Sequence, residues 1–417
     1  MRDQIQIVAA IIFAIALVHT FAANTFESLA KRHPKHAGLL HLLGEVEIVF
    51  GFWSFILIGI MAALAGSDDA ISYVESRQYT EPLFVFVIMV VAASRPILGA
   101  VESLIFYLAK LAPIHNVLSQ VWLYLAMVPL LGSFITEPAA MTIAAIMLAP
   151  LAFNKNVPEW LKYVFLAVLF VNVSIGGTLT AYAAPPVLMV AKEWGWDSTF
   201  MAYNFGWKAA VAVIINASLA SFLLRAYMPK VEDIATVTNK TKTPLLVILI
   251  HLIFLISIVY FSHHPVIFIG LFLLFLGFTQ AYEQYQSPLF LKEGLVVGFF
   301  LAGLVILGGM QQWWLQPLVS SLKPIALFFG AIALTAITDN AALTYLGAQI
   351  DGLSDAAKYM LMAGAVTGGG LTIIANAPNP AGAALLKHAF NDGAINAGFL
   401  LLAALPPTLV AAIMFLI

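Results

Sequence analysis

The sequence predicts an all-α polytopic membrane protein built from two inverted-topology repeats. Hydrophobic residues make up 62% of the 417 positions and charged residues only 10%, against about 25% charged residues in soluble domains. Apolar stretches close to the roughly 20 residues that a spanning helix needs recur along the whole chain. In addition, one short polar pattern occurs twice inside apolar sequence, once in each half of the chain.

The composition also excludes several classes of function. The chain has no cysteine, which rules out disulfides and thiolate metal sites. Its 19 basic and 21 acidic residues give no basic face for nucleic acid. No Gly-Lys dipeptide occurs, so the phosphate-binding loop of an ATP-driven pump is absent. An intramembrane hydrolase would need a nucleophile with a partner His, or a metal-binding His pair, at membrane depth, and no such set is visible. We therefore expect no enzyme activity and no cofactor.

The N-terminal part, residues 1–43, is expected to hold a retained helix over residues 5–23 and a basic loop. The cluster KRHPKH at residues 31–36 is the densest basic run in the chain, and the positive-inside rule places it in the cytoplasm. Its histidines are best explained as part of a solvated loop, because no other metal ligands accompany them.

Residues 44–228 are expected to form the first repeat. A helix over residues 44–65 precedes an acidic external loop at residues 68–81, and a helix from residue 82 breaks at Ser94-Arg95-Pro96, where proline removes a backbone donor. Two short arms, residues 117–131 and 139–153, predict a re-entrant hairpin because each is too short to span. Residues 160–190 predict a discontinuous helix, and residues 199–227 a complete one.

Residues 229–263 are expected to form a cytoplasmic linker and a connecting helix, and residues 264–417 the second, inverted repeat. Its expected segments are residues 265–278, 295–310, a second hairpin, a broken segment at 359–386 and a last helix at 398–417. The total is about ten crossings and two hairpins. An odd number of crossings between the copies turns the second upside down, as in many secondary transporters.

The repeated pattern is a polar hairpin tip followed by a glycine-rich break. In the first copy the tip is Thr136-Glu137-Pro138, and the break runs from Gly176-Gly177 to Thr180. The second copy has Thr338-Asp339-Asn340 and a break from Gly368 to Thr372. A carboxylate inside apolar sequence is costly in a bilayer, which points to a functional role.

Glu137 and Asp339 are the expected exchangeable charges. Inversion would bring the two tips together near the bilayer centre, where a pair of carboxylates can hold protons or a dehydrated cation such as Na⁺. Hard cations prefer oxygen ligands. The expected supporting ligands lie at the tips and breaks: Thr136, Asn172, Thr178, Thr180, Thr338, Asn340, Thr372 and Asn376.

Two alternatives remain open at these positions. Either carboxylate alone could instead cap the start of a helix. Lys208, in the middle of a predicted helix, could neutralise a carboxylate or carry a proton, or it could snorkel or pair for structural reasons.

The two motif pairs resemble those of the ion-transporter superfamily, which contains dicarboxylate, arsenite and citrate carriers and NhaD-type sodium/proton antiporters. The resemblance covers residues 46–417 and is strongest at the second copy, where the Asp339-Asn340 tip is followed by Gly368-Gly369-Gly370 and Asn376. The group it indicates is the sodium/proton antiporters. The first tip has Glu137-Pro138 in place of an Asp-Asn pair, and neither tip has the Ser-Asn-Thr signature of the dicarboxylate carriers.

We therefore predict a secondary transporter of a bacterial-type inner membrane that exchanges cytoplasmic Na⁺ or Li⁺ for external protons, with both termini outside. Its partners are then small inorganic cations and the lipid bilayer, and the resemblance implies a scaffold that can form a homodimer. The alternative is a proton- or sodium-coupled anion carrier for arsenite, citrate or another organic acid.

Overall fold

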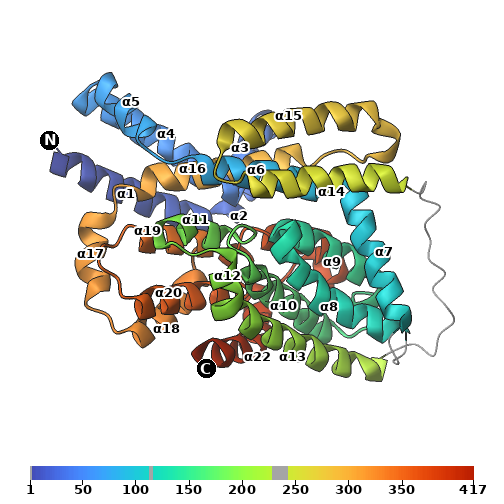
Figure 1. Ribbon diagram of the computed structural model, residues 1–417. Helices are drawn as coiled ribbons and strands as arrows, with labels where there is room; N and C mark the ends of the chain where they lie inside the picture. The colour runs from blue at the N-terminus through green and yellow to red at the C-terminus, as the bar shows by residue number, and fades with distance from the viewer. Residues whose placement is uncertain (1, 112–115, 228–242) are drawn as a thin grey trace.

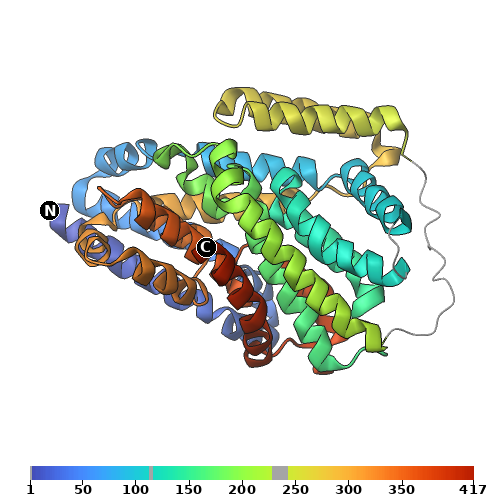
Figure 2. The same ribbon diagram turned by 60° about the horizontal axis from the view of Figure 1, so that its bottom comes forward.

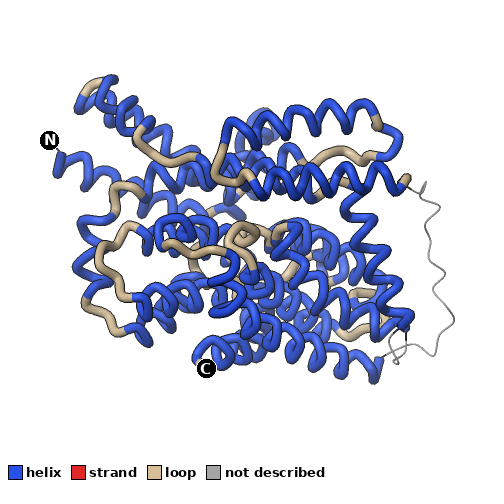
Figure 3. Tube along the Cα trace, viewed as in Figure 1, coloured by secondary structure: helices blue, strands red, loops and turns tan. Residues whose placement is uncertain are grey.

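The computed structural model describes residues 2–111, 116–227 and 243–417, and these parts consist of helices and their connections (Figure 3). The helices before the first motif copy are α1 (Arg2–Phe21), α2 (Ala23–Arg32), α3 (Ala37–Gly44), α4 (Val46–Ala65), α5 (Ser67–Glu75), α6 (Thr80–Ala92) and α7 (Arg95–Leu111). The predicted interruption near Pro96 is confirmed, because α6 and α7 are bent by 63° at this point.

Two segments that were predicted as loops are largely helical. The basic cluster lies across the end of α2 and a 3₁₀ turn, Pro34–His36, and α5 occupies much of the predicted acidic loop. Asp68 and Asp69 lie in the first turn of α5, where carboxylates stabilise the start of a helix. The prediction treated these charges as loop signals and missed that effect.

The first motif copy lies in a run of six helices. They are α8 (Asn116–Ile135), α9 (Glu137–Ala152), α10 (Glu159–Gly176), α11 (Pro185–Trp194), α12 (Ser198–Met201) and α13 (Trp207–Leu224). The predicted break in the middle of residues 160–190 is confirmed, since α10 ends in a 3₁₀ turn, Gly177–Leu179, and extended backbone follows before α11. A π-helical turn, Ala202–Gly206, joins α12 to α13.

The first hairpin arm is longer than predicted. The prediction ended it at residue 131 and judged it too short to span, but α8 has 20 residues and is long and apolar enough to cross a membrane. Pro129 lies inside α8 and leaves the carbonyl of Leu125 without its usual helical donor. The side-chain amide of Asn172 on α10 donates to that carbonyl at 2.8 Å, and this bond helps α8 to continue.

The second half contains nine helices in the described part of the chain. They are α14 (Leu245–Tyr260), α15 (Pro265–Ala281), α16 (Leu291–Gly308), α17 (Gln312–Ser320), α18 (Pro324–Thr335), α19 (Asn340–Ala348), α20 (Asp355–Gly368), α21 (Asn379–Leu386) and α22 (Ala397–Leu416). The predicted break in residues 359–386 is confirmed between α20 and α21. Most of the predicted linker, residues 229–242, lies outside the described residues.

The helices are arranged in two layers (Figure 1). One layer contains α1, α4, α6 and α16, with α16 packed on both α4 and α6. The other contains both motif copies and is centred on α10, whose span is 94% buried. The α14–α15 hairpin projects from the rest of the molecule when the view is turned (Figure 2). The motif copies therefore lie in one layer and face the other.

Length and composition identify fewer membrane crossings than the sequence predicted. Within the described residues, six helical segments are long and apolar enough to span, or seven if α6 and α7 form one bent span. These segments support a polytopic membrane protein. The predicted ten crossings, which did not include the two hairpins, exceed that number in part because α14 and α15 were counted as crossings but are shorter than 18 residues.

Candidate functional site

The first tip places Glu137 at the start of α9. Thr136 precedes this helix with φ of 79°, a left-handed conformation that is uncommon outside glycine. The carboxyl group of Glu137 is completely buried and lies at a helix N-terminus, where the aligned backbone dipoles favour negative charge. The tip is therefore a strained turn that presents one carboxyl group to the protein interior.

The break after α10 packs directly on this tip. A Cβ atom added to Gly177 would collide with the carboxyl group of Glu137, and one added to Gly176 would lie 2.7 Å from the carbonyl oxygen of Pro129. The hydroxyl of Ser133 donates to the carbonyl of Gly176 at 2.7 Å, and Thr180 donates to the carbonyl of Ser133 at 2.6 Å. The two glycines therefore make room for the tip and its acid.

The second tip and break repeat these contacts. A Cβ atom added to Gly369 would collide with the side chains of Asn340 and Ser174, and one added to Gly368 would lie 2.7 Å from the carbonyl oxygen of Ile332. Thr372 donates to the carbonyl of Ala336 at 2.9 Å, as Thr180 does to Ser133 in the first copy. By these contacts the residue that corresponds to Glu137 is Asn340.

Asp339 therefore corresponds to Thr136, one position earlier in the tip. Its carboxylate caps α19 and accepts hydrogen bonds from the backbone amides of Ala341 at 2.8 Å and Ala342 at 3.2 Å. Asp339 is only partly buried, whereas Glu137 is fully buried. The two predicted carboxylates thus occupy different positions in otherwise similar tips.

The two copies contact each other at their tips and breaks. The amide of Asn376, in the second break, donates to Oε2 of Glu137 at 2.9 Å. Ser174 on α10 donates to the carbonyl of Val366 on α20 at 2.7 Å. The exchange extends to whole helices, because α11 packs on α19 and α21 packs on α9. Each copy therefore completes the surroundings of the other.

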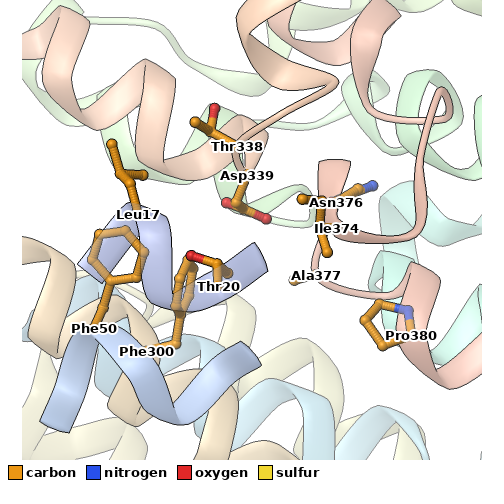
Figure 4. A pocket seen from close by; sticks show the side chains of 10 residues that line it. All are labelled: Leu17, Thr20, Phe50, Phe300, Thr338, Asp339, Ile374, Asn376, Ala377 and Pro380. Carbon is orange, nitrogen blue, oxygen red and sulfur yellow. The ribbon is translucent and has the colours of Figure 1, made fainter. Parts of the chain in front are cut away.

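A small cavity lies between Asp339 and the other layer of helices. Its volume is about 30 Å³, which is enough for about one water molecule. Asp339 and Asn376 line one side, and Thr20 of α1 and Phe50 of α4 are among the residues on the other (Figure 4). Since Asn376 also binds Glu137, it links the buried acid to the cavity that Asp339 lines.

Several oxygen atoms around the tips are buried and lack a hydrogen-bond partner. Buried polar atoms are normally hydrogen-bonded, so a group of unpartnered oxygens indicates a place where a ligand can bind. They are Oγ1 of Thr136, Oε1 of Glu137, Oδ1 of Asn340, Oδ1 of Asn376 and Oδ1 of Asn379. No Lys or Arg among the described residues forms an ion pair with Glu137. The site thus offers oxygen ligands without a neutralising side chain.

The other predicted ligands are occupied by backbone contacts. Their hydroxyl groups donate to carbonyls of nearby turns and keep lone pairs: Thr178 to Ile175, Thr180 to Ser133, Thr338 to Leu334, and Thr372 to Ala336. Asn172 binds the carbonyls of Leu125 and Val213 and accepts from Asn216. The structure therefore places Asn172 in the packing of α8, α10 and α13.

Lys208 has partners away from the two acids. Its ammonium group donates to the hydroxyl of Tyr359 at 2.8 Å, and Tyr359 donates to the carbonyl of Phe415 at 2.8 Å. These contacts join α13 to α20 and to the end of α22. They match the structural alternative considered for Lys208.

The sequence reasoning missed three polar residues that shape the site. Asn379 donates to the carbonyls of Gly369 and Thr372 at 2.7 and 2.9 Å and so holds the second break open. Ser174 donates to Val366, just before the break of the opposite copy, and Ser133 donates to Gly176, in the break of its own copy. Asn379 stands three residues after Asn376, between two prolines, and that position is a signal that could have identified it.

One known protein family matches the chain over most of its length. The sequence model of the family described as "Putative Na⁺/H⁺ antiporter" matches residues 4–417, nearly the whole chain. The chain belongs to this family. The predicted resemblance to sodium/proton antiporters is thereby confirmed. Membership of this family supports a multi-pass membrane protein that exchanges cations for protons. The protein is then a transporter, and small cations are its substrates. No curated protein matches the chain at a significant level.

A transported ion needs a different site from a resident metal. No group of three or more His, Cys, Asp or Glu side chains that could hold a metal ion occurs among the residues that the structure describes. One or two carboxylates with neutral oxygen ligands suit a cation that must also leave.

Proposed function

We propose that this antiporter exchanges cytoplasmic Na⁺ or Li⁺ for external protons, with Glu137 as the group that binds either the cation or the proton. The observation that carries the proposal is the set of unpartnered buried oxygens at the two tips and the second break, among them Oε1 of Glu137. An ionised carboxylate buried without a cation is too costly to persist. Glu137 must therefore be protonated or bind a cation, and competition between these two states is sufficient for antiport.

Asp339 has a related role in this proposal. It is close enough to Glu137 for the two groups to interact electrostatically, and it lines the cavity that Asn376 connects to the buried acid. A cation that entered this cavity would meet a carboxylate, the amide oxygen of Asn376 and then Glu137. We assign Asp339 to attracting and passing the ion. The hydroxyls of Thr136, Thr178, Thr180, Thr338 and Thr372 and the amide of Asn340 would supply further oxygens.

The two copies would act as inverted repeats. The matched contacts of Gly177 with Glu137 and of Gly369 with Asn340, and the exchange of α11 and α21 between copies, support that arrangement. The layer that contains the copies would move past the layer of α1, α4, α6 and α16, which would serve as the scaffold and as the contact of a homodimer. We place the protein in a bacterial-type inner membrane.

Proton movement in everted vesicles tests this function. Respiration acidifies the lumen, a pH-sensitive dye reports the gradient, and NaCl, LiCl, KCl, citrate or arsenite is then added. We expect Na⁺ or Li⁺ to collapse the gradient and the double variant Glu137→Gln, Asp339→Asn to abolish that response. A response to an anion alone would favour the anion carrier, and full antiport in the double variant would disprove the site assignment.

A further inference from the structure

A groove separate from the ion site runs between α7, α8 and α13. Its volume is about 390 Å³, within the range of small-molecule binding sites. Apolar side chains cover most of its wall, among them Leu108 of α7, Trp122 of α8 and Phe222 of α13. None of the candidate ion ligands lines it. The groove is therefore distinct from the two tips and their breaks.

Three serines line the groove, Ser119 on α8 and Ser218 and Ser221 on α13. Ser218 accepts a hydrogen bond at 3.0 Å from the indole N–H of Trp122. The hydroxyl of Ser221 is unpartnered although the residue is only 8% exposed. A buried donor without a partner costs about 1–3 kcal/mol, so a ligand oxygen at this position would be stabilised. The wall is thus apolar with one hydroxyl available for a hydrogen bond.

The surroundings of the groove are those of a bilayer. Both α8 and the segment 198–227 are long and apolar enough to span a membrane. Phe222, on the groove wall, is 70% exposed, which suits contact with hydrocarbon. A long apolar chain that enters this groove would therefore come from the lipid around it.

One end of the groove carries positive charge. Arg225 lines it and lies in the exposed turn Arg225–Tyr227 after α13. The sequence continues with Lys230, Lys240 and Lys242, and the positive-inside rule assigns such a cluster to the cytoplasmic side. Anionic lipid headgroups are attracted to basic pockets between membrane helices on that side.

We propose that this groove binds a phospholipid with an anionic headgroup. One acyl chain lies against Trp122 and Phe222, the hydroxyl of Ser221 donates to an ester oxygen, and Arg225 attracts a headgroup whose net charge is negative. The lipid then contacts α8, which ends directly before the Thr136-Glu137 tip. The site would hold a lipid against the helix that leads into the tip with the ion-binding acid.

Quenching of Trp122 fluorescence tests the proposal on the full-length protein in detergent micelles. The probes are phosphatidylglycerol and phosphatidylcholine with brominated acyl chains, which quench indole on contact. We expect a saturable quenching component with phosphatidylglycerol, and an apparent affinity about five-fold lower with phosphatidylcholine, as expected when one basic residue contributes about 1 kcal/mol. Trp122→Phe should remove that component, and Trp207→Phe, on an exposed indole elsewhere on α13, should leave it.

Variants of Arg225 and Ser221 test separately the binding of the headgroup and of the ester oxygen. Arg225→Gln should make the two lipid curves coincide, whereas Lys323→Gln, an exposed lysine outside the groove, should preserve their separation. Ser221→Ala should weaken both curves. Coincident curves in the wild type would indicate ordinary lipid contact, and no quenching at Trp122 would indicate that protein covers the groove. Either result would overturn the proposal.

Discussion

The two motif copies share their packing but differ in where they carry charge. In both, a Gly-Gly pair lies against a hairpin tip. A threonine after the break, Thr180 or Thr372, donates to the carbonyl four residues before one position of that tip, which is residue 137 in the first copy and residue 340 in the second. The first copy has a buried acid, Glu137, at that position, and the second has the neutral Asn340. Its own acid, Asp339, caps the helix one position earlier. Similar frames therefore place one carboxylate inside the protein and one at a cavity.

The largest expected effect comes from replacing the buried acid of the first copy with an amide, as in the second copy. Glu137→Gln would make both tip positions neutral amides and should reduce Na⁺-dependent proton movement in everted vesicles to the background, because the group that alternates between proton and cation is lost. Asp339→Asn should leave measurable antiport with weaker Na⁺ dependence, because the buried acid remains. Equal losses in the two single variants would show that the carboxylates act as one unit.

The next effect tests the link between the copies. Asn376→Ala removes the amide that binds Glu137, and a hydrogen bond to a charged group contributes about 1.5–3 kcal/mol. The concentration of Na⁺ that gives half-maximal antiport should rise by about 10-fold to 100-fold. Asn172→Ala is the matched control, because it removes an equally buried amide whose partners lie in helix packing. It should lower thermal stability and change Na⁺ dependence little.

Substitution of the first glycine of each break tests whether the two copies pack equally tightly. Gly176→Ala and Gly368→Ala each place a methyl group 2.7 Å from a backbone carbonyl oxygen of the neighbouring hairpin. Overpacking of this kind costs about 1–3 kcal/mol, so both variants should unfold at lower temperature in detergent. Similar losses are expected if the copies are equivalent, and a loss at only one glycine would show that their packing differs. Gly99→Ala, where a methyl group meets no neighbour, is the control.

The smallest effect is expected at Lys208, which lies on α13 and belongs to neither tip nor break. Lys208→Gln should retain antiport and lose only a little thermal stability, since the ammonium group binds Tyr359 and is partly exposed. Tyr359→Phe removes the same bond from the other side and should behave alike. Loss of antiport in Lys208→Gln with normal activity in Tyr359→Phe would instead give the lysine a direct role in transport.

The helix breaks could be predicted from the sequence because proline and glycine act locally. The interruptions at Ser94-Arg95-Pro96, after Gly176 and after Gly368 all occur where those residues indicated them. The full length of α8 could not be predicted, because its continuity past Pro129 is supported by an amide from α10.

The polar site was predicted in part for a similar reason. The sequence identified both tips and Asn376, since buried polar residues in apolar segments are conspicuous. It matched acid with acid, whereas the contacts match Glu137 with Asn340, because spatial equivalence follows packing against the glycines. The roles of Asn379 and Asn172 depend on carbonyls freed in other segments, which no local pattern reveals.

The bond from Asn172 to Leu125 also has a mechanical consequence. A proline inside a membrane helix creates a natural bending point, because one rung of the hydrogen-bond ladder is missing. In α8 the carbonyl left free by Pro129 accepts a hydrogen bond from Asn172 on α10, so bending of α8 at Pro129 would strain or break this bond. This bond therefore couples the first hairpin arm to the broken helix, and in the proposed transport cycle a motion that changes the exposure of Glu137 would move both together.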